Sequence, residues 1–350
     1  MAHPTMEQAA GTLRRFADQA CRGESPLYEH LCSQTADDQR LLGIVLAAPA
    51  GQPMPNLFLG AIHYLLLAGA EHELAAFYPS CVAAPKPHQH AFPAFREFCL
   101  AHEAAIRDLV AHRRVQTNEV CRCAYLLPAF MHVARTTGDR PLVLIDIGTS
   151  GGLNLIWDRY AYDFGPGKFW GNPAAPVRIT TELRGHLVPR LTDQPPVVAH
   201  RIGVDLHIPD LTSTTEALWL KALIWPDQPE RMQRLTAAIP EWRRSPPDLL
   251  GGNALDVLPD LIRTASRAAT VCIVHCHTLN QFSVEQREAF HNLLAAAGRD
   301  RPVVELSAEW IGTATPELWL LDWTGGVAQD EHLANVDQHG RWIQWLVAAD

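Results

Sequence analysis

The stretch from Leu142 to Leu155 constrains the fold of this chain more than any other. Residues 142–147 are an unbroken apolar run that carries one acid, Asp146, and the turn Gly148-Thr149-Ser150-Gly151-Gly152 follows at once. A run that is apolar on both faces is typical of a central parallel strand. Glycines allow a sharp turn and a close approach of a ligand, and residues 153–160 predict a helix whose free N–H groups point at that ligand. The stretch therefore predicts a strand–turn–helix nucleotide site.

The spacing of this turn distinguishes between nucleotides. A dinucleotide fingerprint needs a glycine where this chain has Ser150, and a phosphate-binding Walker loop needs a Gly-Lys-Ser or Gly-Lys-Thr that is absent from the sequence. An acid two residues before the first glycine resembles the first motif of class I S-adenosylmethionine-dependent methyltransferases. That resemblance implies that Asp146 lies near the charged end of the cofactor, with Gly148, Thr149, Ser150, Gly151 and Asn154 along it. The alternative is an ordinary glycine-rich turn without a ligand.

Composition limits the class of protein. Hydrophobic residues make up 47% of the chain and charged residues 19%, which is enough apolar material for a substantial core. The formal net charge is -9 and there is no basic run, so we expect no nucleic-acid partner. No stretch approaches the ~20 apolar residues of a membrane span, and the first residues lack the apolar core of a secretory signal. The eight cysteines are scattered, so we expect reduced thiols and a cytoplasmic protein.

The order of predicted elements indicates an α/β fold. Residues 5–135 are patterned as helices, including 6–22, 94–114 and 117–135, whereas strands alternate with helices from Pro141 onward. The predicted strands are 142–147, 177–183, 199–206, 248–250, 269–277 and 302–306, and 318–323 with 341–347 as a closing pair. This succession predicts a Rossmann-like sheet of the class I methyltransferase type at 139–350, preceded by a helical cap at 1–138.

Polar residues follow several of these strands. In an open α/β sheet, ligands bind at the carboxyl ends of the strands, so Asp146, Asp205 and the pair Asn253-Ala254 are expected to meet in one site. The resemblance implies that Asp205 accepts the ribose hydroxyls and that Asn253 and Ala254 hold the adenine, although an acid is usual at position 253. The structural alternative for each is a helix cap or a surface loop.

The fourth strand ends in Cys272-Ile273-Val274-His275-Cys276-His277. Alternate residues of a strand share a face, so His275 and His277 are expected to point together, away from the two cysteines. Four ligands do not converge from one strand, and no metal is predicted. We expect His275 to be a general base and His277 to contact the substrate.

A second polar set precedes an apolar helix. Asn118, Glu119 and Arg122 are predicted to lie within about one helical turn. One interpretation is a surface cluster of caps and salt bridges. The other is a set that holds a zwitterionic or carboxylate substrate, with Glu119 as a second candidate base and Tyr160 as a further substrate contact.

Several motifs together resemble a bacterial family of unknown function whose core is similar to class I methyltransferases. They lie at 116–120, 151–160, 171–174, 203–206, 222–226 and 339–342. The resemblance implies a fold and a cofactor class, not a reaction. We therefore expect an S-adenosylmethionine-dependent transferase, a methyltransferase acting on a small polar molecule. The alternatives are transfer or cyclisation of the cofactor's aminobutyrate chain, and a nucleotide-binding regulatory protein without turnover. The sequence predicts no oligomeric state.

Overall fold

The computed structural model describes residues 4–313 and 315–348, which divide into two compact units. The helical unit contains the residues up to 117 together with 212–236, and the sheet unit contains 118–211 and 237 onward. The first boundary thus lies at 117/118 and not at the expected 138/139. The chain also returns once to the helical unit, which the sequence pattern did not predict. Whether the helical unit caps the sheet stays a prediction.

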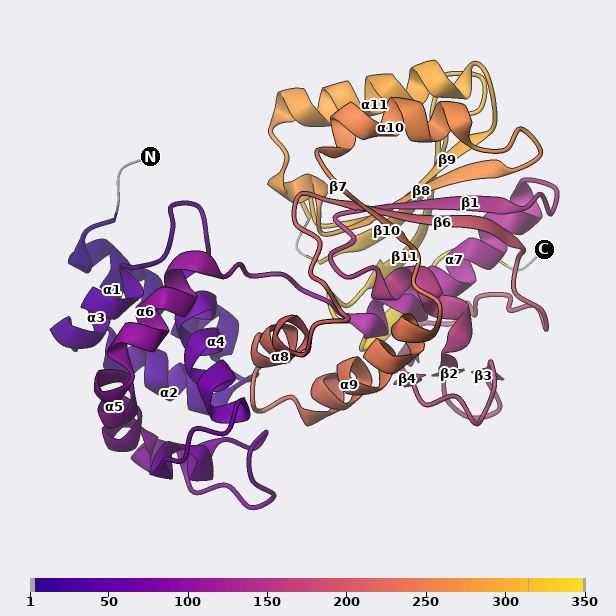
Figure 1. The fold of residues 1–350 in the computed structure, drawn as a ribbon. Helices are drawn as coiled ribbons and strands as arrows, with labels where there is room; N and C mark the ends of the chain where they lie inside the picture. The colour runs from indigo at the N-terminus through magenta and orange to yellow at the C-terminus, as the bar shows by residue number, and fades with distance from the viewer. Residues whose placement is uncertain (1–3, 314, 349–350) are drawn as a thin grey trace. The chain divides into compact units, whose positions relative to one another are not determined.

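The helical unit is built from amphipathic helices around one apolar core (Figure 1). Short turns of π- or 3₁₀-helix, η1 (Ala17–Cys21), η2 (Glu73–Phe77) and η3 (His88–His90), lie between the α-helices. The predicted helix 94–114 is in fact two, because the chain breaks at His102. The α-helices are α1 (Met6–Phe16), α2 (Pro26–Thr35), α3 (Gln39–Val45), α4 (Met54–Leu67), α5 (Ala91–Ala101), α6 (Glu103–His112) and α8 (Thr214–Ala222).

Buried polar contacts attach α8 to the helical unit. The Trp219 indole donates to the carbonyl of Arg114 at 2.8 Å, and Trp219 belongs to the apolar core of this unit. The His63 ring lies between the carbonyl of Ala222, at 2.9 Å, and the Ser80 hydroxyl, at 2.7 Å. Burial lowers the pKa of His63 to about 4, so its ring is neutral at neutral pH. Helix α9 (Pro229–Arg244) continues from there across the boundary at 236/237.

The sheet unit is of mixed α/β class. Its main sheet has the strand order β5-β12-β11-β10-β9-β8-β1-β6-β7, and β9, β8, β1, β6 and β7 run parallel. The chain starts in the middle at β1, goes out to β6 and β7, and then returns to the other side for β8 and β9. The switch point lies between β1 and β8. The parallel strands are β1 (Leu142–Ile147), β6 (Val198–Asp205), β7 (Asp248–Gly251), β8 (Thr270–Cys276) and β9 (Val303–Glu309).

The sheet continues beyond β9 differently from the expectation. Strands β10 (Glu317–Asp322), β11 (Gln329–Val336) and β12 (Trp342–Trp345) form an antiparallel meander, and β5 (Glu182–Arg184) pairs with β12. The predicted closing pair is therefore wrong, because the unpredicted β11 lies between its two members. The predicted strand 177–183 is split between β5 and β4 (Arg178–Thr180). The latter joins a small second sheet with β2 (Ala161–Asp163) and β3 (Phe169–Trp170).

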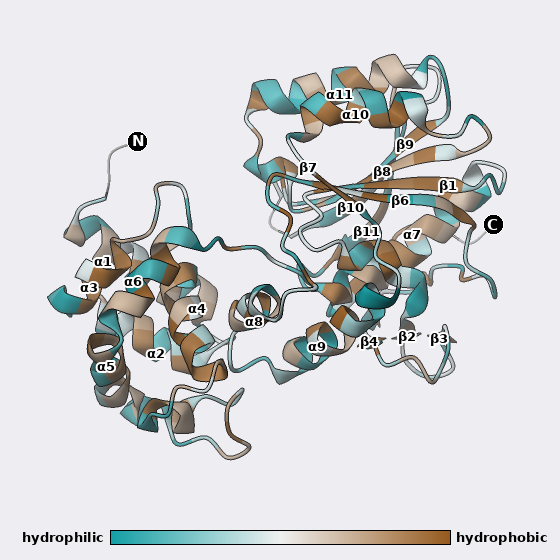
Figure 2. Ribbon diagram, in the orientation of Figure 1, coloured by the Kyte–Doolittle hydropathy of each residue, from teal (hydrophilic) through white to brown (hydrophobic). Residues whose placement is uncertain are grey.

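The side chains of the sheet alternate between two covered faces. Val143, Ile145 and Ile147 of β1 pack with Leu258 of α10 (Ala254–Thr264) and with Phe290 of α11 (Val284–Gly298) in one core. Figure 1 shows α10 and α11 along this face and α7 (Cys123–Thr136) on the other. All six residues of β1 are buried, and the central strands are the most hydrophobic part of this unit in Figure 2. The apolar run was therefore a correct signal for a central parallel strand.

Two expected helical segments are shorter than predicted. Residues 113–119 are irregular, a single 3₁₀ turn η4 (Val120–Arg122) follows, and only then does α7 begin. After the glycine turn, Leu153–Arg159 is a kinked 3₁₀ segment, η5, and not an α-helix. The turn therefore has no long helix behind it whose dipole would attract an anion.

Candidate functional site at the carboxyl ends of the parallel strands

The glycine turn is closed by its own hydrogen bonds. Gly148 and Thr149 donate their amides to the carbonyl of Val204 at 2.8 and 3.3 Å, and Gly152 donates to Thr149 at 3.0 Å. Ser150 N–H donates to Asp205 Oδ2 at 2.8 Å, and Gly151 N–H donates to Asn118 Oδ1 at 3.0 Å. All five amides from 148 to 152 thus have partners within the protein, so the turn presents no row of free donors to a phosphate.

The backbone conformation explains the glycines at the two ends of the turn. Gly148 and Gly152 both have a φ of 72°, in the left-handed region. A Cβ at Gly148 would also overlap the side chain of Thr278, which closes the turn from β8. Ser150 has a φ of 50°, a conformation that is uncommon outside glycine. The sequence predicted that a ligand would come close to the main chain here, but at Gly148 the close neighbour is the Thr278 side chain.

Asp146 is a buried acid below the turn. Its side chain is 6% exposed, and its Oδ2 accepts a hydrogen bond from the Thr149 hydroxyl at 2.8 Å. Burial raises the pKa of Asp146 to about 7, against the Thr149 hydrogen bond, and the nearby charge of Asp205 raises it further. The charges of His275 and Arg122 lower the pKa of Asp146, but the effect of burial outweighs them.

Asp205 lies at the end of β6, where the register pairs Asp146 with Gly203 and brings both acids to one edge. Its Oδ2 accepts from Ser150 N–H, and its Oδ1 accepts from His207 N–H at 3.0 Å. A carboxylate has about four lone-pair positions, so both oxygens retain capacity for further donors. The expected convergence of Asp146, the turn and Asp205 is present.

Asn253 and Ala254 follow β7 as expected. Asn253 is the N-cap of α10, and its side-chain oxygen accepts from Leu255 N–H at 3.1 Å. Ala254 is buried in the core beneath it. The capping role foreseen as the structural alternative is real, and it leaves the Asn253 amide group as a donor.

Asn118 belongs to the glycine turn and not to a substrate-facing set. Its Nδ2 donates to the Ser150 hydroxyl at 2.8 Å, while its Oδ1 accepts from Gly151 N–H. One side chain therefore bridges two consecutive residues of the turn. The prediction that Asn118 contacts substrate is not supported by this placement, because both ends of its amide are used to hold the turn.

Glu119 and Arg122 separate from Asn118 because the predicted helix does not begin at 117. Glu119 is buried, its Oε1 accepts from Cys121 N–H at 3.1 Å, and its Oε2 lies 3.6 Å from His339 Nδ1. It caps the 3₁₀ turn η4, so a role as base stays a prediction that the geometry does not favour. Arg122 reaches the carbonyls of Gln338 and Cys276.

Two other candidates have structural roles. Tyr160 is fully buried, and its hydroxyl donates to the carbonyl of Leu153 at 2.8 Å. It is not exposed to a substrate, contrary to expectation. Asn154 is partly exposed, and its Oδ1 accepts from the Cys123 thiol at 3.4 Å. A cofactor contact of Asn154 stays a prediction.

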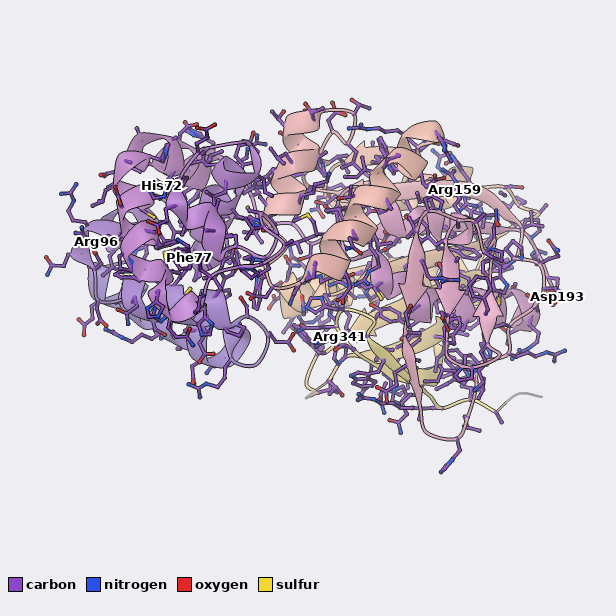
Figure 3. The ribbon with its side chains drawn as sticks, turned by 90° about the horizontal axis from the view of Figure 1, so that it is seen from below. His72, Phe77, Arg96, Arg159, Asp193 and Arg341 are labelled. Carbon is purple, nitrogen blue, oxygen red and sulfur yellow. The ribbon has the colours of Figure 1, made fainter. Side chains whose placement is uncertain are left out.

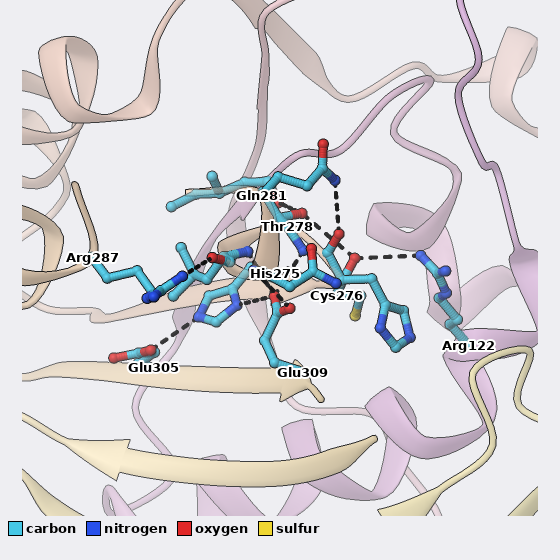
Figure 4. Close-up of polar contacts among 12 residues, drawn as sticks. Arg122, His275, Cys276, Thr278, Gln281, Arg287, Glu305 and Glu309 are labelled. Carbon is cyan, nitrogen blue, oxygen red and sulfur yellow. Dashed lines mark hydrogen bonds and ion pairs between the residues drawn. The ribbon is translucent and has the colours of Figure 1, made fainter. Parts of the chain in front are cut away.

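His275 is the centre of a buried charge cluster between β8 and β9 (Figure 4). Its exposure is 0%, and its Nδ1 and Nε2 lie 2.9 Å from Glu309 and Glu305 respectively. Burial alone lowers the pKa of His275, but hydrogen bonds to the two carboxylates outweigh it and raise this pKa to about 9. The same contact holds the pKa of Glu305 at about 2, against the opposing effect of burial. Both ring nitrogens of His275 are thus engaged and its charged form is favoured, so the role as general base stays a prediction that this environment does not favour.

Glu309 transmits this cluster to the edge of the sheet. Its Oε1 accepts the amides of Thr278 and Leu279 at 2.8 and 3.0 Å, which fixes the start of the 3₁₀ turn η6 (Leu279–Gln281). Thr278 in turn donates to the carbonyl of Ile147 at 3.1 Å and packs against Gly148. His275 therefore supports the glycine turn from below through Glu309 and Thr278.

The sequence itself contains a signal for this cluster. Glu305 and Glu309 are two acids in the otherwise apolar strand β9, and the register pairs His275 with Ser307 between them. Residues two apart in a strand share a face, so both acids lie diagonally across from His275. A buried acid in an apolar strand requires a partner, and His275 was the available cation.

His277 does not share the direction of His275. It has a φ of 58°, which breaks the alternation of β8, and its ring centroid lies 4.8 Å from that of Trp310. Burial and the charge of Arg122 lower the pKa of His277 to about 4, so the ring is neutral at neutral pH. That His277 contacts a substrate stays a prediction.

Two further properties concern the described residues only. None of the helices that the structure describes is long and apolar enough to cross a membrane. Residues 4–313 and 315–348 contain no group of three or more His, Cys, Asp or Glu side chains that could hold a metal ion.

Comparison with known proteins identifies a family and nothing more specific. The family described as "Uncharacterized protein conserved in bacteria (DUF2332)" matches residues 10–345, which is almost the whole chain. None of the curated proteins and none of the solved structures matches this chain. The function must therefore be inferred from its own residues.

Proposed function

The chain belongs to this bacterial family, and we propose that it is an S-adenosylmethionine-dependent transferase, a methyltransferase that acts on a small polar molecule. The strand order β7-β6-β1-β8-β9, with an antiparallel strand beside β9, supports a sheet of the class I methyltransferase type. Beyond β9 the sheet continues as the antiparallel meander β10, β11 and β12, in which β10 pairs with β11 and β11 pairs with β12.

One observation carries the proposal: two carboxylates lie next to the turn after β1, while the amides of the turn are bonded within the protein. All five amides from 148 to 152 are bonded within the protein. Asp146 and Asp205 lie near the carboxyl ends of β1 and β6, next to the turn, and the charge of Asp205 raises the pKa of Asp146. A pyrophosphate requires free donors, whereas a cationic nucleoside with a ribose diol suits two acids. S-adenosylmethionine has both features.

Each acid has a distinct role in this proposal. Asp205 would accept the two ribose hydroxyls through its remaining lone pairs, and the Ser150 and His207 amides orient it for this. Asp146 would place negative charge beneath the positively charged end of the ligand, and that charge would repay the cost of ionising a buried acid. Asn253 follows β7, where the resemblance implies that the adenine binds, and its amide group would be a hydrogen-bond donor there.

The chemistry asked of the protein is modest. S-adenosylmethionine supplies an activated methyl group, which moves to a nucleophile by in-line displacement while the sulfur retains the electron pair of the broken bond. The protein's own residues need to align the acceptor with that methyl group and exclude water. Asn118 contributes by bonding the turn directly, and Glu309 contributes by holding Thr278, which bonds the end of β1.

Titration calorimetry with S-adenosylmethionine and with NAD tests the ligand class. We expect saturable binding of the first and none of the second. Asp205→Asn keeps the size of the side chain and removes its charge, and it should weaken binding at least tenfold through loss of charged hydrogen bonds. Asp193→Asn is the matched control, because Asp193 is an exposed loop residue at the periphery of the sheet unit (Figure 3). Binding of NAD alone, or unchanged affinity in Asp205→Asn, contradicts the proposal.

The products distinguish methyl transfer from other uses of the same ligand. Methyl transfer converts S-adenosylmethionine to S-adenosylhomocysteine, whereas transfer or cyclisation of the aminobutyrate chain releases methylthioadenosine. Mass spectrometry of reactions with pools of small polar metabolites therefore reports the reaction class. Methylthioadenosine as the enzyme-dependent product would replace the methyltransferase assignment with the second reaction class.

A further inference from the structure

Arg122 is a buried cation that donates hydrogen bonds to backbone carbonyls, and its charge lowers the pKa of the buried Asp146 without an ion-pair contact between them. It is 9% exposed, its Nε donates to the carbonyl of Gln338 at 3.1 Å, and its Nη1 donates to the carbonyl of Cys276 at 3.4 Å (Figure 4). No carboxylate of the described residues lies within ion-pair distance of it. A buried charge is normally paired, because leaving it unpaired is costly. A guanidinium has five N–H donors, so Arg122 retains capacity for an anion.

His277 lies close enough to Arg122 to feel its charge and is itself incompletely bonded. Within the described residues neither buried ring nitrogen makes a hydrogen bond of normal geometry, although the backbone of Gln338 interacts with the ring and raises its pKa. Buried polar atoms without partners are uncommon in folded proteins and require an explanation such as a missing ligand. The neutral ring has one nitrogen that donates and one that accepts.

The backbone at His277 is also strained. Its φ of 58° places a non-glycine residue in the left-handed region, which costs on the order of 1–3 kcal/mol and is found mostly at functional sites. The His277 ring lies against the ring of Trp310, a residue that is 39% exposed. An exposed indole, a neutral imidazole and a buried guanidinium therefore follow one another at the ends of β8 and β9.

The chemistry of this group favours one kind of ligand. A single guanidinium matches the two oxygens of one carboxylate. A phosphate dianion calls for more positive charge than one arginine, since His277 is neutral. The indole surface offers contact to an apolar or aromatic body attached to that carboxylate. Asn118 and Glu119, expected beside Arg122 in such a set, are instead engaged with the glycine turn and with Cys121.

We propose that Arg122, His277 and Trp310 form the acceptor subsite, and that the acceptor is a small carboxylic acid with an apolar or aromatic body. The carboxylate binds Arg122, His277 adds a hydrogen bond, and the body lies on Trp310. The proposal rests on the proposed function in calling this ligand the acceptor, because the subsite lies at the same edge of the sheet as Asp146 and Asp205.

Benzoate is a suitable probe, and its binding is measured without S-adenosylmethionine by ligand-observed saturation-transfer NMR and by calorimetry. We expect saturable binding of benzoate, at least tenfold weaker binding of the uncharged benzamide, and no displacement of benzoate by equimolar inorganic phosphate. Equal binding of benzoate and benzamide, absence of benzoate binding at millimolar concentration, or displacement by phosphate overturns the proposal. These comparisons use the wild-type chain and do not depend on a variant folding.

Variants then locate the subsite. Arg122→Gln should weaken benzoate binding at least tenfold. The benzoate affinity of Arg122→Lys should lie between those of Arg122→Gln and wild type, because lysine keeps the positive charge but lacks the two parallel N–H donors of the guanidinium. His277→Asn should weaken binding less, since asparagine tolerates the left-handed conformation. Arg287→Gln is the control: Arg287 also donates to backbone carbonyls, of Leu279 and Phe282, and should leave benzoate binding unchanged. Unchanged benzoate affinity in a folded Arg122→Gln overturns the assignment.

The two proposals fail separately. S-adenosylmethionine that does not bind the wild-type chain refutes the proposed function, whereas benzoate binding that depends on Arg122 would then still establish the carboxylate subsite. Conversely, S-adenosylmethionine binding without any benzoate binding refutes only the subsite.

Discussion

Asp146→Asn tests the electrostatics of the proposed site without reference to any reaction. The substitution keeps the size of a buried side chain and removes its ability to ionise. The Thr149 hydroxyl donates to Asp146 Oδ2 and retains an acceptor in the amide oxygen. What changes is the cost of holding a carboxylate in a site where burial raises its pKa from 3.8 to about 7.

The magnitude follows from the two pKa values. The folded pKa of this acid is raised above its unfolded value, so its ionisation destabilises the folded state. The penalty is absent below pH 3.8, grows as the pH rises, and is complete above about pH 7. It amounts to about 2 kcal/mol at pH 5 and roughly 4 kcal/mol at pH 8. Asp146→Asn should therefore gain roughly 2.5 kcal/mol over wild type between these two pH values.

Urea unfolding at pH 5 and pH 8 measures this difference, followed by tryptophan fluorescence and by far-UV circular dichroism in parallel. Two probes are needed because the two units can unfold separately. The difference between the two pH values is independent of any constant gain or loss from the new amide. Asp193→Asn, the exposed control, should show no such change. A difference between Asp146→Asn and wild type that is equal at pH 5 and pH 8 refutes the raised pKa of Asp146.

Four further predictions follow from individual contacts. Gly148→Ala should destabilise the sheet unit by roughly 1–3 kcal/mol in urea unfolding, because a Cβ there is strained at a φ of 72° and overlaps Thr278; a smaller loss than 0.5 kcal/mol would contradict the tight contact. Asn118→Ala should weaken S-adenosylmethionine binding in calorimetry, since it releases Ser150 and Gly151; unchanged affinity would return Asn118 to the substrate side. The stabilising charge of His275 is complete below pH 6.5 and is lost as the pH rises through about 9, so wild-type thermal stability should fall between pH 7 and 10 and His275→Gln should lack this fall; parallel profiles would refute the imidazolium. Tyr160→Phe should cost about 1 kcal/mol of stability and leave ligand affinity unchanged, whereas a large loss of affinity would place Tyr160 in the site.

The sheet was predictable where the pattern was locally unambiguous. Six consecutive apolar or buried positions in β1, followed by glycines, identify a central strand because only a strand covered on both faces is patterned in this way. The ends of β1 and β6 then bring Asp146 and Asp205 together by topology alone. These inferences required no knowledge of side-chain contacts.

The errors arose where long-range packing overrides local pattern. Strand β11 alternates weakly, with Asp330, Glu331 and His332 among its residues, and only its place between β10 and β12 makes it a strand. Helical periodicity placed Asn118 at the start of a helix, whereas its bonds to Ser150 and Gly151 hold it in irregular chain. Such contacts join residues more than thirty positions apart, and periodicity carries no information about them.

His275 shows the same limit for chemistry. A histidine at the end of a strand in an α/β sheet suggests a base, and its environment in the structure does not favour that role. The acids that capture it, Glu305 and Glu309, are on the neighbouring strand and are found only through the register of β8 with β9. The sequence already placed Arg122 in a substrate-holding set, whereas its contacts with the carbonyls of Gln338 and Cys276 are visible only in the fold.

Hydrogen–deuterium exchange with and without saturating S-adenosylmethionine tests the central claim most directly, because it reports binding and its location together. We predict slowed exchange in peptides that cover 146–152 and 203–207, with the helical peptides at 26–45 unchanged as an internal reference. Binding without protection of these two segments, or exchange that S-adenosylmethionine leaves unaltered throughout the chain, would contradict the claim that the carboxyl ends of β1 and β6 hold this ligand.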